Sequence, residues 1–415
     1  MKVLLVVRGS QGDVYPYLGL AGELEKRGHD VTLSLPRIFE NEARSAALHY
    51  VLQAFDDIEG MMGDVPDTKN LLDWTRRVIA SQFTEIIPLL RQSDVLVAAN
   101  TEFAAASIAE YCNKPLIRTA FGPFIPGRVI PPPVFPWSKP HPVFRPVFLW
   151  ALLNLGLNLM VKKIINRHRC ALGMRPIADQ ADHAPSIGDN YLMYSKYLGN
   201  TDPAWKYRWN IGGYCFNDTF PYSRKAYEKY LAFIKKDDRP AVFFTLGSCN
   251  AVKRDRFAAW LFDICRENNY RLVVGCGWWE VGARLPASED LFLLDSAIPH
   301  HLVFPHVTAI IHHGGSGTTH SASRAGKPQM VVPLLLDQFY WGQRICDLGA
   351  GPGSVKMSGI SKKYLARRVT DLLTNPEYRK NAGALAGRMR EERGLENICE
   401  HIESYGEMAE ERIAE

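Results

Sequence analysis

The stretch from Ile310 to Thr319, IIHHGGSGTT, places two histidines directly before three glycines and several hydroxyl side chains. Three kinds of site fit such a stretch: a metal site, a phosphate-binding loop, or an ordinary turn between a strand and a helix. His312 and His313 are adjacent, so on a strand end their side chains point to opposite faces. No cysteine or carboxylate stands at a ligand spacing nearby. We therefore expect no metal at this turn.

The same turn suits a phosphate group. Gly314, Gly315 and Gly317 allow the backbone to approach a ligand closely. A glycine turn that opens a helix also leaves free N–H groups where the helix dipole favours an anion. Thr318 adds a hydroxyl donor, and a histidine at the strand end can donate to a diphosphate oxygen. The alternative is a turn whose glycines serve only the packing of a strand against a helix.

A second polar pair follows the next strand expected along the chain, KPQMVVPLL. Asp337 and Gln338 come just past its carboxyl end. A carboxylate, which accepts, beside an amide, which accepts and donates, suits the hydroxyl groups of a sugar. Asp337 could also cap the helix that follows, and the two roles are compatible.

The elements that must position these residues alternate between strand and helix. Buried strands are expected at KVLLVV, HDVTLSLP, DVLVAAN and KPLIRTA, and in a second block at RPAVFFTLGS, NYRLVVGCG, DLFLLDS, VTAIIHH and KPQMVVPLL. Such alternation implies parallel sheets with helices on both faces, which bind ligands beyond the carboxyl ends of the strands. We predict two α/β domains, residues 1–212 and 236–390, joined by a polar linker at 213–235.

The composition excludes several other classes of protein. The 415 residues are 47% hydrophobic, unlike a disordered chain, and a net charge of +5 is too mild for a nucleic-acid-binding surface. The eight cysteines form no CxxC pair, so reduced thiols in a cytoplasmic protein are expected. No apolar run reaches about 20 residues, so no membrane-spanning helix is predicted.

Two long stretches carry a resemblance to a known family. HHGGSGT together with RAGKPQMVVPLLLDQFYWGQRICDLGAG resembles the donor signature of family 1 glycosyltransferases, GT-B enzymes that move a sugar from a nucleotide diphosphate. GSQGDVYPYLGLAGELEKRGHDVTL and GYCFND extend the resemblance over most of the chain. The motif near the start of the chain, GSQGDVYPYLGLAGELEKRGHDVTL, is most similar to sterol glucosyltransferases, glycopeptide-antibiotic glycosyltransferases and rhamnosyltransferases of the rhamnolipid type. The resemblance implies two doubly wound Rossmann-like domains facing a central cleft, with final helices, residues 391–415, crossing back to the first domain.

The resemblance also implies a role for individual residues. His313 matches the histidine that contacts the donor diphosphate, and Asp337 with Gln338 matches the pair that holds the donor sugar. The other donor-binding positions are Ser10, Gly12, Ser248, Ile298, Pro299, Gly315, Gly317 and Thr318. Asp13 matches the candidate catalytic base of the antibiotic and sterol branches of the family. A base is needed because an acceptor hydroxyl must lose a proton as it attacks the anomeric carbon.

Alternatives remain for Asp13. It could be the N-cap of a helix starting at Val14, and Asp337 is a rival base. Asn100 and Glu102 follow a neighbouring strand end and are the candidates for a supporting group. The charge that develops on the leaving diphosphate would be met by His313 and the helix N-terminus. The resemblance therefore implies inverting transfer with neither a metal nor another cofactor.

The nucleotide of the donor stays open between UDP and dTDP. Plant members of the family carry a glutamate eight residues past the histidine, where it holds the ribose hydroxyls, and Ser321 stands at that position here. A deoxyribose lacks one of those hydroxyls, which favours a dTDP-sugar. Sterol-type relatives also lack the glutamate and use UDP-sugars.

The acceptor is expected in the first domain. A segment rich in proline and aromatic residues follows the strand KPLIRTA, and Phe121, Phe124 and Trp137 are the candidate contacts for a lipophilic acceptor. The apolar stretch Val147–Val161 is expected as a helix packed over the substrate cleft. Because the basic segment Lys162–Arg175 follows, the alternative is a helix on the inner face of a membrane, in peripheral contact.

Two rival functions share the fold. A nucleotide-sugar 2-epimerase would need no separate acceptor and no apolar loop. A non-catalytic GT-B binding partner would be expected to lose the catalytic residues, yet Asp13, His313, Asp337 and Gln338 are all present. An NAD-dependent enzyme is disfavoured because GSQGD lacks the GxGxxG spacing.

Overall fold

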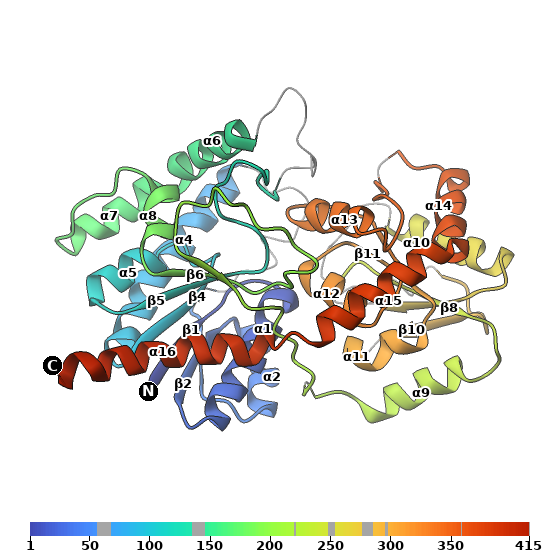
Figure 1. Ribbon diagram of the computed structural model, residues 1–415, viewed down its shortest axis with the longest axis horizontal. Coiled ribbons are helices and arrows are strands. Elements are labelled where there is room, and N and C mark those ends of the chain that lie inside the picture. The colour runs from blue at the N-terminus through green and yellow to red at the C-terminus, as the bar shows by residue number, and fades with distance from the viewer. Residues whose placement is uncertain are drawn as a thin grey trace.

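A computed structural model of the protein describes residues 1–55, 68–134, 146–219, 221–247, 254–275, 285–294, 298–357 and 359–414. They form two α/β lobes that lie side by side (Figure 1). Within the described residues, the first lobe holds a seven-stranded sheet in the order β3-β2-β1-β4-β5-β6-β7 and the second a five-stranded sheet in the order β10-β9-β8-β11-β12. Every pair of neighbouring strands is parallel. The predicted fold class is therefore confirmed.

The strands are short and mostly buried. The first sheet consists of β1 (Lys2–Val6), β2 (Asp30–Leu35), β3 (Tyr50–Leu52), β4 (Val95–Ala99), β5 (Leu116–Ala120), β6 (Asp189–Leu192) and β7 (Trp209–Ile211). The second consists of β8 (Ala241–Thr245), β9 (Arg271–Gly275), β10 (Leu291–Leu294), β11 (Ala309–His312) and β12 (Gln329–Val331).

Helices cover both sheets. Those of the first lobe are α1 (Gln11–Lys26), α2 (Glu40–Ser45), α4 (Thr68–Arg91), α5 (Ala105–Cys112), α6 (Pro146–Leu157), the π-helical turn η2 (Asn158–Lys162), α7 (Lys163–Ala171) and α8 (Gln180–Ser186). Those of the second are α9 (Arg224–Ile234), α10 (Arg254–Glu267), α11 (His300–Val303), α12 (Ser316–Arg324), α13 (Gln338–Asp347), α14 (Lys362–Thr374) and α15 (Pro376–Arg390), before α16 (Gly394–Ala414). Short 3-10 turns lie at Arg37–Phe39 and Phe304–His306.

The first strand shows why these sequences form a two-faced sheet. Val3 and Leu5 belong to one hydrophobic core layer, together with residues of α1 and α16. Leu4 and Val6 belong to the opposite layer, with residues of α4 and α5. Successive side chains of a strand point to opposite faces, so a strand buried on both faces is a continuous apolar run.

The connection between the lobes is shorter than predicted. Helix α9 lies inside the predicted linker 213–235 but packs on the second lobe, where Tyr230 is fully buried and its hydroxyl donates to the Val303 carbonyl at 2.8 Å. The sequence did not predict this helix because only one of its faces is apolar, so that its composition is as polar as that of a linker.

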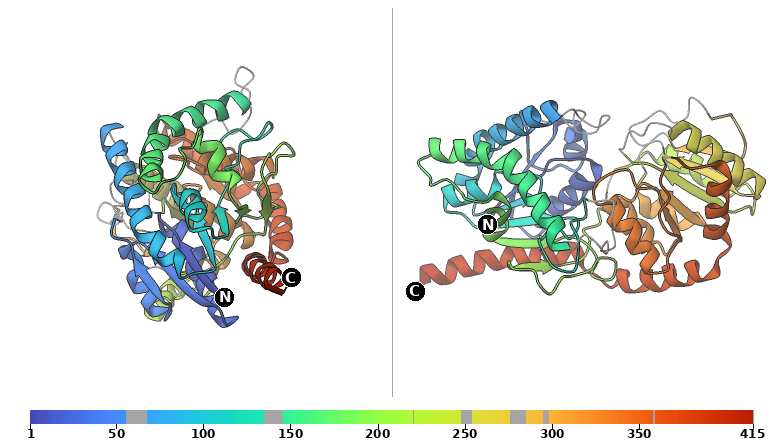
Figure 2. Two further views of the ribbon diagram at one scale, coloured as in Figure 1. Left: turned by 90° about the vertical axis from the view of Figure 1, so that its left-hand side faces the viewer. Right: turned by 90° about the horizontal axis from the view of Figure 1, so that it is seen from above.

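The last helix returns to the first lobe. Helix α16 runs along that lobe in Figure 1 and lies beneath it in the right-hand view of Figure 2. Its side chain Glu403 accepts hydrogen bonds from Arg27 and His29, at 3.1 and 2.9 Å. Tyr405 donates to Asp189 at 2.6 Å. The chain therefore passes between the lobes twice.

Candidate active site

The strand order of each sheet reverses at a point where its ligand would be expected. The reversal lies between β1 and β4 in the first sheet and between β8 and β11 in the second. The turns that leave β1 and β11 meet at the boundary between the lobes: a Cβ atom added to Gly317, in the first turn of α12, would lie 3.9 Å from Cα of Gly12, in the first turn of α1. Two helix N-termini from different lobes thus adjoin one another.

The two adjacent histidines have different tasks. His312 is fully buried; its Nε2 contacts the Gln329 side-chain oxygen at 2.9 Å, and its Nδ1 accepts from the Gly314 N–H at 3.1 Å. These partners fix the neutral ring with its proton on Nε2. Burial lowers the pKa of His312 to about 3, so the ring stays neutral. His312 therefore holds the turn in shape from inside the core.

Replacing His312 with Ala is expected to lower the free energy of unfolding by about 2–4 kcal/mol, since it leaves a cavity and removes two buried hydrogen bonds. Urea unfolding followed by circular dichroism measures this. His313→Ala is the control, with a smaller expected loss because one nitrogen of that ring has no partner among the described residues. Equal losses would show that His312 has no special structural role.

His313 lies between two glycines. A Cβ atom at Gly247 would approach its Cε1 to 2.6 Å, and one at Gly315 would overlap its Nε2. The ring is buried, and within the described residues its Nδ1 has no hydrogen-bond partner. Burial also lowers the pKa of His313 to about 4, which keeps the ring neutral. A buried polar atom without a partner is costly, so this nitrogen is suited to a ligand.

The hydroxyl groups around the α12 N-terminus are partly engaged. Ser316 Oγ donates to the Phe121 carbonyl of the first lobe at 2.9 Å, and Thr319 Oγ1 donates to the Gly315 carbonyl at 2.8 Å. Thr318 is buried in the same turn. Because Gly315 caps the helix without a side chain, a ligand can come close to the backbone N–H groups of the first turn.

Asp13 lies in the first turn of α1, which begins three residues earlier than predicted, after the N-cap Ser10. The alternative, that Asp13 is the N-cap of a helix starting at Val14, is therefore wrong. The Ser10 N–H and hydroxyl donate to Asp13 Oδ2 at 2.8 and 3.2 Å. Gly9 has φ +140°, and a Cβ atom there would overlap the carboxylate. Burial outweighs the Ser10 hydrogen bonds and raises the pKa of Asp13 to about 6.

Asp337 precedes α13 but makes no capping hydrogen bond with its side chain. Instead its Oδ2 accepts from Trp341 Nε1 at 2.9 Å. Burial, and to a smaller extent the charge of Asp13, raise the pKa of Asp337 to about 7. The two carboxyl groups, one from each lobe, are thus close enough to interact. Gln338 Oε1 accepts from the Leu334 and Leu335 N–H groups, at 2.8 and 3.1 Å, so this oxygen already shapes the preceding loop.

Among the described residues, Glu102 makes no hydrogen bond with Asp13. Its carboxylate lies 3.7 Å from Arg8 Nε instead. Both side chains are buried. Burial raises the pKa of Glu102, and the Arg8 charge opposes the shift. No contact among the described residues therefore supports the hypothesis that Glu102 assists Asp13 directly.

The other predicted contacts differ in their surroundings. Phe121 is buried at the lobe boundary, and Phe124 is half-buried against Gly122. Ile298 packs in the core of the second lobe, and Pro299 is the N-cap of α11. The predicted residues Ser248 and Trp137 lie outside the described residues.

One important histidine was not predicted. His320 of α12 accepts from the Ser195 N–H of the first lobe at 3.1 Å and contacts the Ser316 carbonyl at 2.7 Å through Nδ1. Its ring stacks on Tyr214 with centroids 4.5 Å apart. His320 therefore ties the helix that opens at the site to the opposite lobe. Ser195 lies 125 residues away in the chain, so no local sequence pattern could predict this contact.

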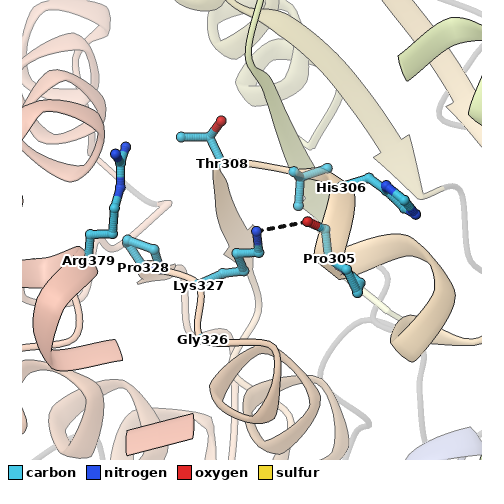
Figure 3. A pocket seen from close by; sticks show the side chains of 8 residues that line it. Pro305, His306, Thr308, Gly326, Lys327, Pro328 and Arg379 are labelled. Atoms are coloured by element: carbon cyan, nitrogen blue, oxygen red, sulfur yellow. Dashed lines mark hydrogen bonds between the residues drawn. The ribbon is translucent and has the colours of Figure 1, made fainter. Parts of the chain in front are cut away.

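Elsewhere on the second lobe, Figure 3 shows a hollow between α15 and the 3-10 turn at Phe304–His306. Lys327 and Arg379 line it, and Lys327 Nζ donates to the Pro305 carbonyl at 2.9 Å. None of the predicted site residues lines this hollow. Among the described residues, no group of three or more His, Cys, Asp or Glu side chains could hold a metal ion.

Two doubly wound lobes that meet through the turns at their strand-order reversals form the GT-B architecture of glycosyltransferases. Comparison with known proteins agrees. The glycosyltransferase family 28 N-terminal domain matches residues 3–131, and the C-terminal domain typified by erythromycin biosynthesis protein CIII matches residues 288–404.

Relatives of known activity match over nearly the whole chain. A sterol 3-beta-glucosyltransferase of Arabidopsis thaliana is 27% identical over 95% of the chain, which spans 66% of that relative's length. The vancomycin aglycone glucosyltransferase of Amycolatopsis orientalis is 27% identical over 94% of both chains. The chain belongs to the family 1 glycosyltransferases of the GT-B fold, as the sequence motifs predicted.

Solved structures share the fold. The kitacinnamycin glycosyltransferase superposes with a TM-score of 0.73 at 17% identity, over 97% of this chain and 98% of the other. The glycosyltransferase VinC in complex with dTDP superposes with a TM-score of 0.68 at 17% identity, over 99% of this chain and 100% of the other.

Proposed function

We propose that the protein transfers a sugar from a UDP- or dTDP-sugar to a hydroxyl group of a lipophilic small molecule, with inversion at the anomeric carbon. One observation carries this proposal: the N-termini of α1 and α12, from different lobes, adjoin one another at Gly12 and Gly317. A base on the first helix and a diphosphate site on the second would then lie on either side of one reacting carbon.

The second lobe would hold the donor. The N–H groups at the start of α12 would bind the diphosphate, and His313 would donate a hydrogen bond from Nδ1–H to a phosphate oxygen, since this nitrogen has no partner among the described residues. Asp337 would accept a hydrogen bond from a hydroxyl of the sugar. Fixed dipoles of this kind stabilise charge as it develops on a leaving group, and we propose that no metal or other cofactor takes part.

The first lobe would supply the base. Asp13 takes the proton of the acceptor hydroxyl as that oxygen attacks the anomeric carbon. The bond from this carbon to the diphosphate oxygen breaks, and its electron pair leaves with the nucleoside diphosphate. A single displacement from the opposite side inverts the anomeric configuration. The carboxylate returns its proton to solvent.

The choice of substrates rests on the relatives and on the chemistry of the first lobe. Named relatives act on a sterol and on the vancomycin aglycone, and one solved structure holds dTDP. Phe121 and Phe124 bring aromatic surface to the segment after β5, next to the lobe boundary. The free thiols among the described cysteines fit our proposal of a cytoplasmic protein.

The test is a product assay with UDP-glucose and dTDP-glucose against a panel of sterol, polyketide and aromatic alcohols. We expect a glycoside with inverted configuration, identified by mass and by the anomeric proton coupling in NMR, at a rate that EDTA does not change. A 2-epimerase would instead convert the nucleotide sugar without any acceptor. A non-catalytic partner would bind the nucleotide and form neither product.

The raised pKa of Asp13 predicts the pH dependence of this activity. A base acts only when it is deprotonated, so kcat/KM should fall as the pH drops through about 6, rather than near the usual carboxyl pKa of 3.8. Asp337, with a pKa raised to about 7, titrates nearby. The pH profile of kcat/KM for the Asp337→Asn variant should therefore still fall at acid pH. Full activity of the wild type down to pH 4.5 would exclude Asp13 as the base.

A further inference from the structure

We propose that the outer face of the continuous helix α6–η2–α7 is a docking surface for an anionic lipid bilayer. This helix, Pro146–Ala171, lies along the edge of the first lobe (Figure 1). It is long and apolar enough to cross a membrane by length and composition, although the sequence predicted no such helix. The apolar run in the sequence is shorter than the helix, because Asn154, Asn158 and Lys162 interrupt the run whereas the helix continues through them.

The outer face exposes an unusual amount of apolar surface. Leu152, Leu155 and Leu159 are 48%, 56% and 72% exposed, and Val147 is 54% exposed. Spacings of three and four place the three leucines on one side of a helix. Scattered exposed leucines are ordinary on a soluble protein, but a contiguous apolar stripe marks an interaction surface.

The same face becomes basic where the apolar stripe ends. Lys163 and Arg167 follow Leu159 at successive intervals of four residues, and both are exposed. Neither forms an ion pair with any other described residue. A helix with an apolar outer face and a basic end is typical of one that lies in the interface of a bilayer.

Charge around this helix favours lipid over a protein partner. Residues 111–178, the stretch of sequence that contains this helix, hold ten Lys and Arg and no Asp or Glu, whereas the whole chain has a net charge of only +5. The rest of the chain is therefore net acidic. Two of the ten, Arg118 and Arg169, add little to the surface charge, because Arg169 is buried and Arg118 is half-buried. Basic residues near a membrane are attracted by the negative surface potential of its anionic lipids. An apolar stripe flanked by this excess of positive charge matches an anionic bilayer.

The inner face fixes the helix on the lobe, so it would lie on the membrane rather than cross it. Val161, Ile165 and Arg169 are buried at intervals of four, and Arg169 pairs with Glu110 at 2.7 Å. Asn166 exchanges two hydrogen bonds with Ile177, at 2.8 and 3.0 Å. Polar anchors of this kind belong to a helix that is held by protein on one side.

The proposed docking surface adjoins the segment where we expect the acceptor. Trp150 on the inner face donates to the Ile130 carbonyl at 2.8 Å. Ile130 belongs to the loop that begins after β5, whose first residue, Phe121, meets Ser316 across the lobe boundary. The link to catalysis rests on the proposed function, and it implies that a lipophilic acceptor reaches the site from the bilayer.

Sedimentation with vesicles tests the docking. We expect the full chain to bind vesicles of phosphatidylglycerol and phosphatidylcholine, and to bind pure phosphatidylcholine at least tenfold more weakly. Each Lys or Arg near an anionic surface contributes about 1 kcal/mol, so the double variant Lys163→Glu, Arg167→Glu should lower the partition coefficient about thirtyfold or more. Leu155→Ser with Leu159→Ser should abolish binding to both kinds of vesicle.

The second lobe offers matched controls. Lys363 and Arg367 are exposed four residues apart on α14, and Tyr364 between them is 41% exposed. The variant Lys363→Glu, Arg367→Glu and the variant Tyr364→Ser should bind vesicles like the wild type. Equal loss in these controls would mean that only net charge or general apolar exposure matters, and would overturn the proposal.

Two further outcomes would also overturn it. One is binding by the leucine and lysine–arginine variants equal to that of the wild type, with unchanged circular dichroism. The other is a wild-type dimer that becomes monomeric in Leu155→Ser, Leu159→Ser and never binds vesicles, which would make this face a protein interface. Vesicle binding requires neither donor nor acceptor, so its failure is distinguishable from failure of the proposed transferase activity.

Discussion

Replacing Asp13 with Asn is expected to lower kcat by about 10²–10⁴-fold, the usual contribution of a general base. The amide keeps the shape of the side chain and can still contact Ser10, but it cannot take a proton. The affinity for UDP or dTDP should stay within about twofold of the wild type, because the proposed diphosphate site lies on the other lobe. Steady-state kinetics and calorimetric titration of the nucleotide measure the two effects separately.

The carboxyl of Asp337 provides the control for that variant. It lies close enough to Asp13 for their charges to interact, and its pKa is also raised. If Asp337 were the base, Asp337→Asn would cause the larger loss of kcat and Asp13→Asn the smaller. If Asp337 holds the sugar instead, its variant should raise KM for the donor and should not remove the acid limb of the pH profile. Equal kcat in Asp13→Asn and wild type would place the base elsewhere.

The sequence predicted the fold where local pattern and tertiary structure agree. Strands such as β1 and β4 are buried on both faces, so an apolar run bounded by turn residues identified them. Helix α9 was missed because a polar, half-exposed helix looks like a linker. The start of α1 was placed too late, since Gln11 and Gly12 have no apolar periodicity and only the capping pattern around Ser10 marks it.

The site was predictable only in its local part. The glycines beside His313 and the pair Asp337–Gln338 stand out in the sequence, and the structure adds what each side chain touches. That His312 is a core residue follows from its bonds to Gln329 and Gly314, which the adjacent histidines alone could not reveal. Contacts between the lobes, such as His320 with Ser195, join residues too distant for any pattern to connect.

The coupling of the lobes matters for how the site is assembled. Ser316 and His320, both on α12, bond to the first lobe at Phe121 and Ser195. Helix α12 also begins at the turn that carries His313. A change in the position of one lobe relative to the other would therefore move the proposed diphosphate site relative to Asp13. Exclusion of water from this boundary would strengthen the electrostatic interactions on which transfer depends.

Replacing His313 with Ala is expected to weaken the binding of UDP or dTDP by about 10–100-fold, because a hydrogen bond to a charged group contributes about 1.5–3 kcal/mol. The buried ring has a nitrogen with no partner among the described residues, so its loss costs the free protein little and the complex much. Titration calorimetry measures the affinity directly. kcat should fall as well, since the charge on the leaving diphosphate grows in the transition state.

Glycine variants separate the imidazole itself from its position. Gly315→Ala keeps His313, but the added Cβ atom would overlap Nε2 and must displace the ring. We expect its nucleotide affinity to fall toward that of His313→Ala, while Gly383→Ala on α15, where an added Cβ atom meets no atom within 4 Å, should bind like the wild type. Wild-type affinity in both His313→Ala and Gly315→Ala would mean that the helix N-terminus holds the diphosphate without the histidine. A lower nucleotide affinity in His313→Ala alone would show that the ring can shift in Gly315→Ala and still reach the phosphate.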